Sequence, residues 1–169
     1  MKNFKKIVLT IMLGVLVLLP SAVYAKTEVK TNEELKAATK NGGDIVLQND
    51  IVLTDDITVK GQNISIDLNG NTITLKAYID VFEGSLEFKG NGLIKDDRED
   101  TNATIYVYGS ADSKAVAFAT LTVGKDVKIE TKRYGITVWP CEVNKKAVPT
   151  YGTVVNFNGT LISTNKNAG

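Results

Sequence analysis

The chain has 169 residues, 43% of them apolar, and a formal net charge of +1. This length suits one domain, and the near balance of charge argues against a dedicated surface for nucleic acid or anionic membranes. The chain has no histidine and a single cysteine, Cys141, which excludes an internal disulfide and a structural zinc site. Apolar burial and backbone hydrogen bonds must therefore hold the domain together.

The first 25 residues have the three parts of a secretory signal peptide. A start with three lysines precedes a 13-residue apolar run, Ile7–Leu19, which Pro20 ends. The run is shorter than the ~20 residues that a membrane-spanning helix needs, and Val23–Ala25 offers a cleavage site. We therefore predict a signal peptide at residues 1–25 and a secreted or cell-surface domain at 26–169 with no membrane span. This mature part has 17 basic and 19 acidic residues.

The mature part begins with a pattern that is typical of one short helix. Thr31 and Glu34 fit a capping box, in which the threonine side chain bonds the amide three residues further on. Leu35 gives the segment an apolar side, and Asn41–Gly43 supplies the glycine that helix ends favour. The pattern predicts a helix over Asn32–Lys40 that acts as a lid on the rest of the domain.

From Asp44 onward, short runs of alternating apolar and polar residues indicate half-buried strands. The clearest example is Asn63–Lys76, NISIDLNGNTITLK, in which Asn69-Gly70 marks a tight bend. Three such runs make a unit of about 20 residues, and the unit repeats along the chain. The equivalent starts lie 19, 22, 35 and 32 residues apart, at Ile45, Ile64, Leu86, Leu121 and Thr153.

Two polar insertions explain the longer spacings. They are Asp96–Asn102, with further slack at Gly109–Lys114, and Pro140–Thr150, and we expect them to leave the body as loops. An acidic or amide side chain also recurs five residues after each start, at Asp50, Asn69, Asn91, Asp126 and Asn158. In a stack of units these side chains can bond the backbone of the neighbouring bend. Ordinary turn chemistry is the other interpretation.

Such a repeat predicts an all-β fold, a right-handed parallel β-helix (solenoid) of about four and a half rungs with a short N-terminal capping helix. Each strand then pairs with its equivalent in the units above and below, and the inward aliphatic side chains form columns. The rival fold is an antiparallel β-sandwich, which also has short alternating strands. Because the last unit is incomplete, we expect either a longer solenoid, of which this is the N-terminal part, or a partner that stacks on the final unit.

Part of the chain resembles a known family. The capped helix, the stretch NGGDIVLQNDIVLTDDITVKGQNISIDLNGNTIT and the later KGNGLI are similar to the start of pectin-lyase-like β-helix modules. The resemblance is strongest over Thr31–Lys95. It implies a secreted or surface-attached bacterial protein, and it specifies the fold better than the function, because this fold carries lyases, hydrolases, adhesins and passive stalks.

The acidic cluster Asp96-Asp97-Arg98-Glu99-Asp100 is the first candidate for chemistry. The resemblance implies Ca²⁺ binding by its carboxylates, with Arg98 acting on a uronic acid, as calcium and arginine do in pectate lyases. The chain has no EF-hand or nonapeptide calcium motif, and a solvated charged loop is the favoured interpretation. We therefore expect no cofactor, with Ca²⁺ at this cluster as the alternative.

No catalytic residue is predicted. Asp55-Asp56 cannot act as the facing carboxylates of a glycosidase, because neighbouring residues of an extended chain point to opposite sides. The polygalacturonase-like branch of the fold relies on a Gly-His-Gly segment, and the chain has no histidine. The same absence removes Cys-His and Ser-His-Asp catalysis. Cys141 is left as a free thiol or an intermolecular bridge.

Aromatic side chains form the candidate ligand-binding group, which consists of Tyr106, Tyr108, Tyr134 and Trp139. The two residues Tyr106 and Tyr108 alternate with inward residues and are expected to point outward. Tyr134 and Trp139 flank the next strand and are not expected to share its inward face. Outward rings on stacked units would make a shallow platform for sugars. In the alternative interpretation, the rings cover the long insertions and bind no ligand.

These observations favour a secreted or cell-surface β-solenoid module of adhesin or stalk type that is not an enzyme. Its expected partners are a polysaccharide, a cell-surface or host glycan, or a protein, and not nucleic acid. The alternative function is the N-terminal section of a polysaccharide lyase or glycoside hydrolase whose catalytic units lie outside this chain.

Overall fold

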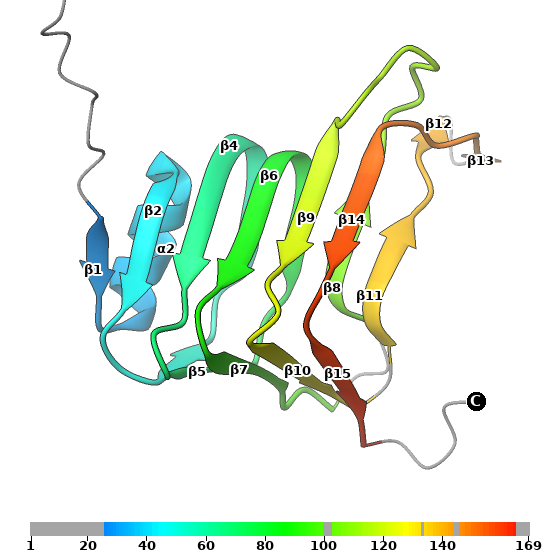
Figure 1. Ribbon diagram of the computed structural model, residues 1–169. Helices are drawn as coiled ribbons and strands as arrows, with labels where there is room; N and C mark the ends of the chain where they lie inside the picture. The colour runs from blue at the N-terminus through cyan, green and yellow to red at the C-terminus, as the bar shows by residue number, and fades with distance from the viewer. Residues whose placement is uncertain (1–25, 100–102, 133, 144–145, 165–169) are drawn as a thin grey trace, which may run out of the picture.

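Strands predominate in the computed structural model, which describes residues 26–99, 103–132, 134–143 and 146–164 (Figure 1). The predicted signal peptide lies outside the described residues. Within them there is one helix, α2, at Asn32–Asn41. The strands are β1 Thr27–Val29, β2 Gly43–Leu47, β3 Ile51–Leu53, β4 Ile57–Asp67, β5 Thr72–Leu75, β6 Ile79–Lys89, β7 Gly92–Asp96, β8 Ala103–Tyr108, β9 Ala119–Val123, β10 Val127–Thr131, β11 Tyr134–Trp139, β12 Glu142–Val143, β13 Lys146–Ala147, β14 Thr153–Phe157 and β15 Thr160–Ser163.

The helix α2 forms where the capping signals predict it and ends one residue later. Thr31 Oγ1 accepts a hydrogen bond from the Glu34 amide at 3.2 Å. Gly42 ends the helix with a φ of 75° and donates its amide to the Ala38 carbonyl at 3.1 Å. The buried side of α2 packs against β2 and β4. Figure 1 shows α2 at the N-terminal end of the sheets, as expected of a lid.

Successive units pair in three parallel ladders, and equivalent segments of neighbouring units lie in the same ladder. The first ladder joins β1, β2, the second halves of β4 and β6, β9 and β14. The second joins β3, β5, β7, β10 and β15. The third joins the first halves of β4 and β6 with β8 and β11. This parallel pairing of equivalent segments confirms that the units stack, and it excludes the antiparallel sandwich.

Two strands pass through two ladders because a glycine lets each of them bend. Gly61 in β4 and Gly84 in β6 have φ values of 91° and 89°, a region that disfavours side chains. A Cβ atom on Gly84 would lie 2.2 Å from the Gln62 carbonyl oxygen. The structure continues the strand through each of these glycines.

The core lies between the ladders as columns of aliphatic and aromatic side chains. Ile45, Ile66 and Phe88 occupy one column, because Ile66 pairs with both of the others, and each is at most 1% exposed. Ile73 pairs with Ile51 and Ile94 in the second ladder in the same way. A continuous column removes apolar surface from water at every unit, which stabilises the stack.

The pairing corrects the predicted register at both ends of the repeat. Ile45 and Thr153 are each displaced by two residues from the position that starts a unit. The aligned positions are Gly43, Ile64, Leu86, Leu121 and Val155. In the last unit, Leu161 pairs with the buried Ile129. A displacement of two residues keeps every side chain on its own face, so alternation alone could not exclude it.

Side chains of the bends bond the backbone of the neighbouring unit, as one of the two interpretations expected. Asp50 Oδ1 accepts a hydrogen bond from the Thr72 amide at 2.7 Å, and Asn69 Nδ2 donates to the Leu47 carbonyl at 3.0 Å. Each bond joins residues 22 positions apart. These bends therefore fix one unit against the next.

The two insertions behave differently. The described part of Pro140–Thr150 leaves the ladders as predicted and carries the short antiparallel pair β12 and β13. The insertion Asp96–Asn102 was predicted to be a solvated loop, and this prediction is wrong for its first half. Asp96 belongs to β7, and Arg98 is buried with it.

Candidate functional site

The outer face of the third ladder carries a group of aromatic side chains. Tyr106 and Tyr108 of β8 alternate with fully buried aliphatic residues and lie on the opposite side of the strand from the core, as predicted. Trp139 of β11 pairs with Tyr108 in the ladder. Phe82 of β6 stacks on Tyr108 with ring centroids 4.0 Å apart and planes 18° apart. Three neighbouring strands therefore contribute rings to one surface.

Tyr106 is covered, although alternation along β8 predicts an outward ring. Only 9% of it is exposed. The Trp139 ring lies edge-on to it at 5.6 Å, and the Tyr78 ring centroid is 6.2 Å away. The Tyr106 hydroxyl accepts a hydrogen bond from the Ala103 amide at 3.1 Å. Tyr106 therefore supports the exposed rings and does not offer its own face to a ligand.

A cleft of about 410 Å³ lies beside the exposed rings. Phe82, Tyr108 and Trp139 contribute aromatic faces to it, and Lys60 and Glu83 contribute charged groups. The other lining residues are Gly109, Phe118, Pro140, Cys141 and Glu142. Trp139 remains 42% exposed. The volume is in the range of small-molecule sites, and a mostly apolar lining with few polar groups is typical of them.

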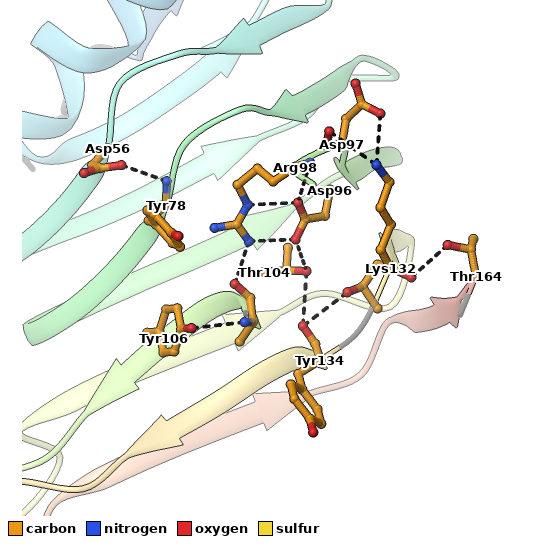
Figure 2. Close-up of polar contacts among 12 residues, drawn as sticks. Asp56, Tyr78, Asp96, Asp97, Arg98, Thr104, Tyr106, Lys132, Tyr134 and Thr164 are labelled. Carbon is orange, nitrogen blue, oxygen red and sulfur yellow. Dashed lines mark hydrogen bonds and ion pairs between the residues drawn. The ribbon is translucent and has the colours of Figure 1, made fainter. Parts of the chain in front are cut away.

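Tyr134 is not among the residues that line this cleft. It begins β11, pairs with the buried Ala103 and is 58% exposed. It lies two residues before Ile136 and so has the parity of the inward series, which corrects the expectation that it avoids that face. In Figure 2 its ring points away from the Asp96 and Arg98 side chains. Of the four predicted residues, the structure thus places Tyr108 and Trp139 at the cleft, Tyr106 behind it and Tyr134 elsewhere.

The half-buried carboxylate of Asp80 contacts Tyr108, one of the aromatic residues that line the cleft. The Tyr108 hydroxyl donates to Asp80 Oδ1 at 3.3 Å. Burial raises the pKa of Asp80, and this hydrogen bond offsets only part of the effect. Burial and the charge of Asp80 raise the pKa of Tyr108 to about 12, so its hydroxyl keeps the proton that it donates. Asp80 therefore orients the Tyr108 ring.

We expect the substitution Asp80→Asn to raise the melting temperature at pH 7. A carboxyl group with a raised pKa in the folded state destabilises the fold when ionised, and this cost is complete above the folded-state pKa. The cost is absent below the unfolded-state pKa of about 3.9, so the difference from the parent protein should vanish there. Thermal unfolding at several pH values measures the effect, with exposed Asp126→Asn as the control. A lower melting temperature at pH 7 would show that the carboxylate stabilises the fold.

Phe82 and Asp80 were not among the residues predicted for the site. Both have the outward parity of the β6 segment, in which Ile79 and Val81 are fully buried. The pairing of Val81 with Val107 brings Phe82 beside the tyrosines of β8. An alignment of the sequence around Ile79 and Val81 with the sequence around Ile105 and Val107 would have predicted that Phe82 lies near Tyr108.

A buried ion pair lies close to the aromatic group (Figure 2). Asp96 and Arg98 are each 6% exposed. Arg98 donates from Nε and Nη2 to the two carboxylate oxygens of Asp96 at 2.9 and 2.7 Å, and from Nη2 to the Ala103 carbonyl at 2.6 Å. Thr104 Oγ1 donates to Asp96 at 3.0 Å, and the guanidinium lies 4.3 Å from the Tyr78 ring centroid. The pair fastens the start of the insertion to β8.

The rest of the acidic cluster is also paired with cations. Asp97 forms ion pairs with Lys76 and Lys132, and Glu99 pairs with Lys132 at 3.0 Å. Asp100 lies outside the described residues. No group of three or more acidic or cysteine side chains suited to a metal occurs in the part of the chain that the structure describes. The described carboxylates therefore do not converge on a Ca²⁺ site, and the Arg98 side chain is buried against Asp96.

The ladders and the outer cleft define an all-β module with parallel sheets and an aromatic hollow on its surface. A family model described as "Putative pectate lyase-like adhesive domain" matches residues 26–167, and the chain belongs to this family. No curated protein and no solved structure matches the chain significantly. The family confirms the pectin-lyase-like resemblance and supports an adhesive or structural module with surface partners outside the cell. Among the described residues, no helix has the length and apolar character that crossing a membrane requires.

Proposed function

We propose that this chain is a secreted, surface-displayed adhesive module, built as a right-handed parallel β-helix, which binds a carbohydrate at the cleft beside Tyr108 and Trp139. The three parallel ladders and their shared core columns support the β-helix. Membership of an adhesive-domain family supports the role. The signal-like first 25 residues support secretion.

The observation that carries carbohydrate binding is the exposed aromatic wall of the cleft. Trp139 and Tyr108 offer flat apolar rings, and Lys60 and Glu83 offer charged hydrogen-bonding groups in the same hollow. Sugar rings have apolar faces and polar rims, so they need both kinds of partner. A Trp or Tyr side chain provides such contact area together with a polar group.

The wall is held in place before any ligand arrives. Phe82 stacks on Tyr108 from one side, and Asp80 accepts a hydrogen bond from its hydroxyl. Tyr106 supports Trp139 edge-on. Preorganised side chains lose little conformational entropy on binding, so more of the contact energy appears as affinity.

Replacing Trp139 by alanine tests this proposal. We expect the parent protein to be retarded by at least one polysaccharide in affinity electrophoresis against polygalacturonate, xylan, mannan and cellulose derivatives. Trp139→Ala should weaken that binding about tenfold or more, because aromatic anchors carry much of the energy of a binding site. Tyr134→Ala is the matched control, since it removes a more exposed ring from the same strand outside the cleft. Equal losses in both variants would contradict the proposed site.

The alternative function is the N-terminal section of a polysaccharide lyase or hydrolase. The words "pectate lyase-like" in the family description support this alternative. Incubation of the purified chain with polygalacturonate and Ca²⁺, followed by ultraviolet absorbance of unsaturated product, separates the two functions. The adhesive proposal expects binding without product. Steady release of product would favour the enzyme.

A further inference from the structure

A second hollow lies on the outer face of the first ladder, in the first three units of the repeat. Its volume is about 500 Å³, and Figure 1 shows the strands that carry it, β2, β4 and β6, side by side. Six of its lining residues have polar side chains, and these are Asn41, Asp44, Asn63, Ser65, Ser85 and Glu87. We call this hollow the polar groove, and the hollow beside Tyr108 and Trp139 the aromatic cleft.

The polar groove opens where the chain leaves α2. Gly42 and Gly43 line it and have φ values of 75° and 96°, a region that disfavours side chains. Gly43 pairs with Ile64, so Gly42 stands in the outward row where the next two units carry Asn63 and Ser85. A Cβ atom on Gly43 would meet no atom within 4 Å. The glycines that end the helix therefore also leave space in front of the ladder.

The polar side chains form two rows that run across the units. Asp44, Ser65 and Glu87 are in register in one row, and Asn63 and Ser85 are in register two residues earlier. Ser65 Oγ donates a hydrogen bond to Glu87 Oε2 at 2.8 Å, and Ser85 Oγ donates to Asn63 Oδ1 at 2.8 Å. These bonds orient the side chains in advance, which lowers the entropy cost of binding a ligand.

Both rows keep hydrogen-bonding atoms that a ligand can use. Within the described part of the chain, Asp44 Oδ2 and Glu87 Oε1 are acceptors without a partner, and Asn63 Nδ2 is such a donor. A hydroxyl group can satisfy either kind, because it both donates and accepts. The two carboxylates lie near one cation, Lys89, which pairs with Asp44 at 3.3 Å, so the groove disfavours an anionic ligand. Its chemistry selects a neutral ligand that is rich in hydroxyl groups.

The polar groove and the aromatic cleft adjoin at the bend of β6. Glu83 lines the cleft and Ser85 lines the groove, and only Gly84 lies between them in the strand. At about 3.3 Å per residue, these two positions are ~7 Å apart. On β4, Gln62 Oε1 accepts a hydrogen bond from the Lys60 amide at 2.6 Å, which holds that side chain against its own strand. A chain of sugars that leaves the cleft across this bend enters the groove.

We propose that the polar groove is a second binding site, which takes further sugars of a neutral polysaccharide whose first sugars stack on the aromatic wall of the cleft. This inference rests on the proposed carbohydrate binding at the cleft, and it names the class of ligand as a neutral polymer and not a polyuronate. The cleft supplies flat apolar contact, and the groove supplies the carboxylate and amide groups that bind hydroxyls.

Titration calorimetry of the mature chain, residues 26–169, with sugars of two lengths tests this proposal. The probes are cellohexaose, xylohexaose and mannohexaose, each compared with its disaccharide. We expect at least one hexasaccharide to bind about tenfold or more tightly than its disaccharide, because it reaches both sites. A double variant with Asn63→Ala and Glu87→Ala should remove this gain and leave disaccharide binding within about twofold of the parent. Trp139→Ala should weaken the binding of both lengths.

Glu130→Ala is the matched control, because Glu130 is an outward acid on β10 that lines neither hollow, and it should bind the hexasaccharide as the parent does. Hexagalacturonate should gain less than about twofold over digalacturonate, since its carboxylates would meet those of Asp44 and Glu87. Circular dichroism of each variant confirms that it is folded.

The outcomes separate this inference from the function on which it rests. A double variant that binds the hexasaccharide as tightly as the parent, while Trp139→Ala does not, would overturn the groove and leave the cleft standing. An equal loss in Glu130→Ala would also overturn the groove. Tighter binding of hexagalacturonate than of the neutral hexasaccharides would overturn the neutral class of ligand. A parent chain that binds none of these sugars would overturn both the groove and the proposed function.

Discussion

Replacing Ile66 by aspartate is expected to abolish folding. Ile66 is fully buried and lies between Ile45 and Phe88 in the first ladder. The substitution removes a large aliphatic side chain from a packed column and leaves a carboxyl group there without a partner. The two effects together cost ~5 kcal/mol or more, which is comparable with the whole stability of a small domain.

Far-ultraviolet circular dichroism and thermal unfolding of Ile66→Asp measure this loss. Thr74→Asp is the matched control, because Thr74 alternates with buried residues on β5 and pairs with Lys95 and Val52 on the outer side. This control should retain a cooperative unfolding transition near that of the parent. A folded Ile66→Asp protein would contradict the stacked columns of the core.

Replacing Arg98 by methionine is expected to cost ~3–5 kcal/mol of the free energy of unfolding. The guanidinium neutralises Asp96 through two hydrogen bonds, and it also donates to the Ala103 carbonyl. Methionine fills part of the space but leaves the Asp96 carboxylate buried without its countercharge. Urea unfolding measures the change. A loss below ~1 kcal/mol would show that the pair is accessible to solvent.

Asp97→Asn is the control for this prediction. Asp97 is the adjacent acid, its side chain is 38% exposed, and its ion pairs with Lys76 and Lys132 lie at the surface. Surface ion pairs contribute ~0–1 kcal/mol, so this variant should unfold nearly as the parent does. A large loss would mean that the segment holds an ion.

The effect of Arg98→Met should depend on pH. Burial alone would raise the pKa of Asp96, but the hydrogen bonds and charge of Arg98 outweigh it and hold the pKa below its ordinary value. A carboxyl group with a lowered pKa stabilises the fold above the unfolded-state value of about 3.9, and this contribution is lost as the pH falls through the folded-state pKa. The difference between parent and variant should therefore be largest near pH 7 and shrink in acid.

Local signals in the sequence were sufficient for the elements and for their stacking. The cap at Thr31 and the glycine at Gly42 define α2, because both act within one turn of the helix. Period-two alternation defines the strands, and its recurrence aligned the three middle units correctly at Ile64, Leu86 and Leu121. These features depend on residues close together in the chain or on a repeat, so they can be predicted from the sequence.

Long-range contacts decided the features that the sequence left open. Arg98 is buried because Asp96, Ala103 and the Tyr78 ring meet around it, and Tyr106 is covered because Trp139 lies across it from the next strand. The fold determines which of these residues meet, and no periodic pattern in the sequence predicts the contacts.

The sequence by itself therefore determined the strands, the capping helix and the parallel stacking of units. Only the tertiary structure decided the register of the first and last units, the buried ion pair and the aromatic cleft. The physical reason is that alternation specifies which face a side chain occupies but not which neighbour it meets, since a shift of two residues preserves every face.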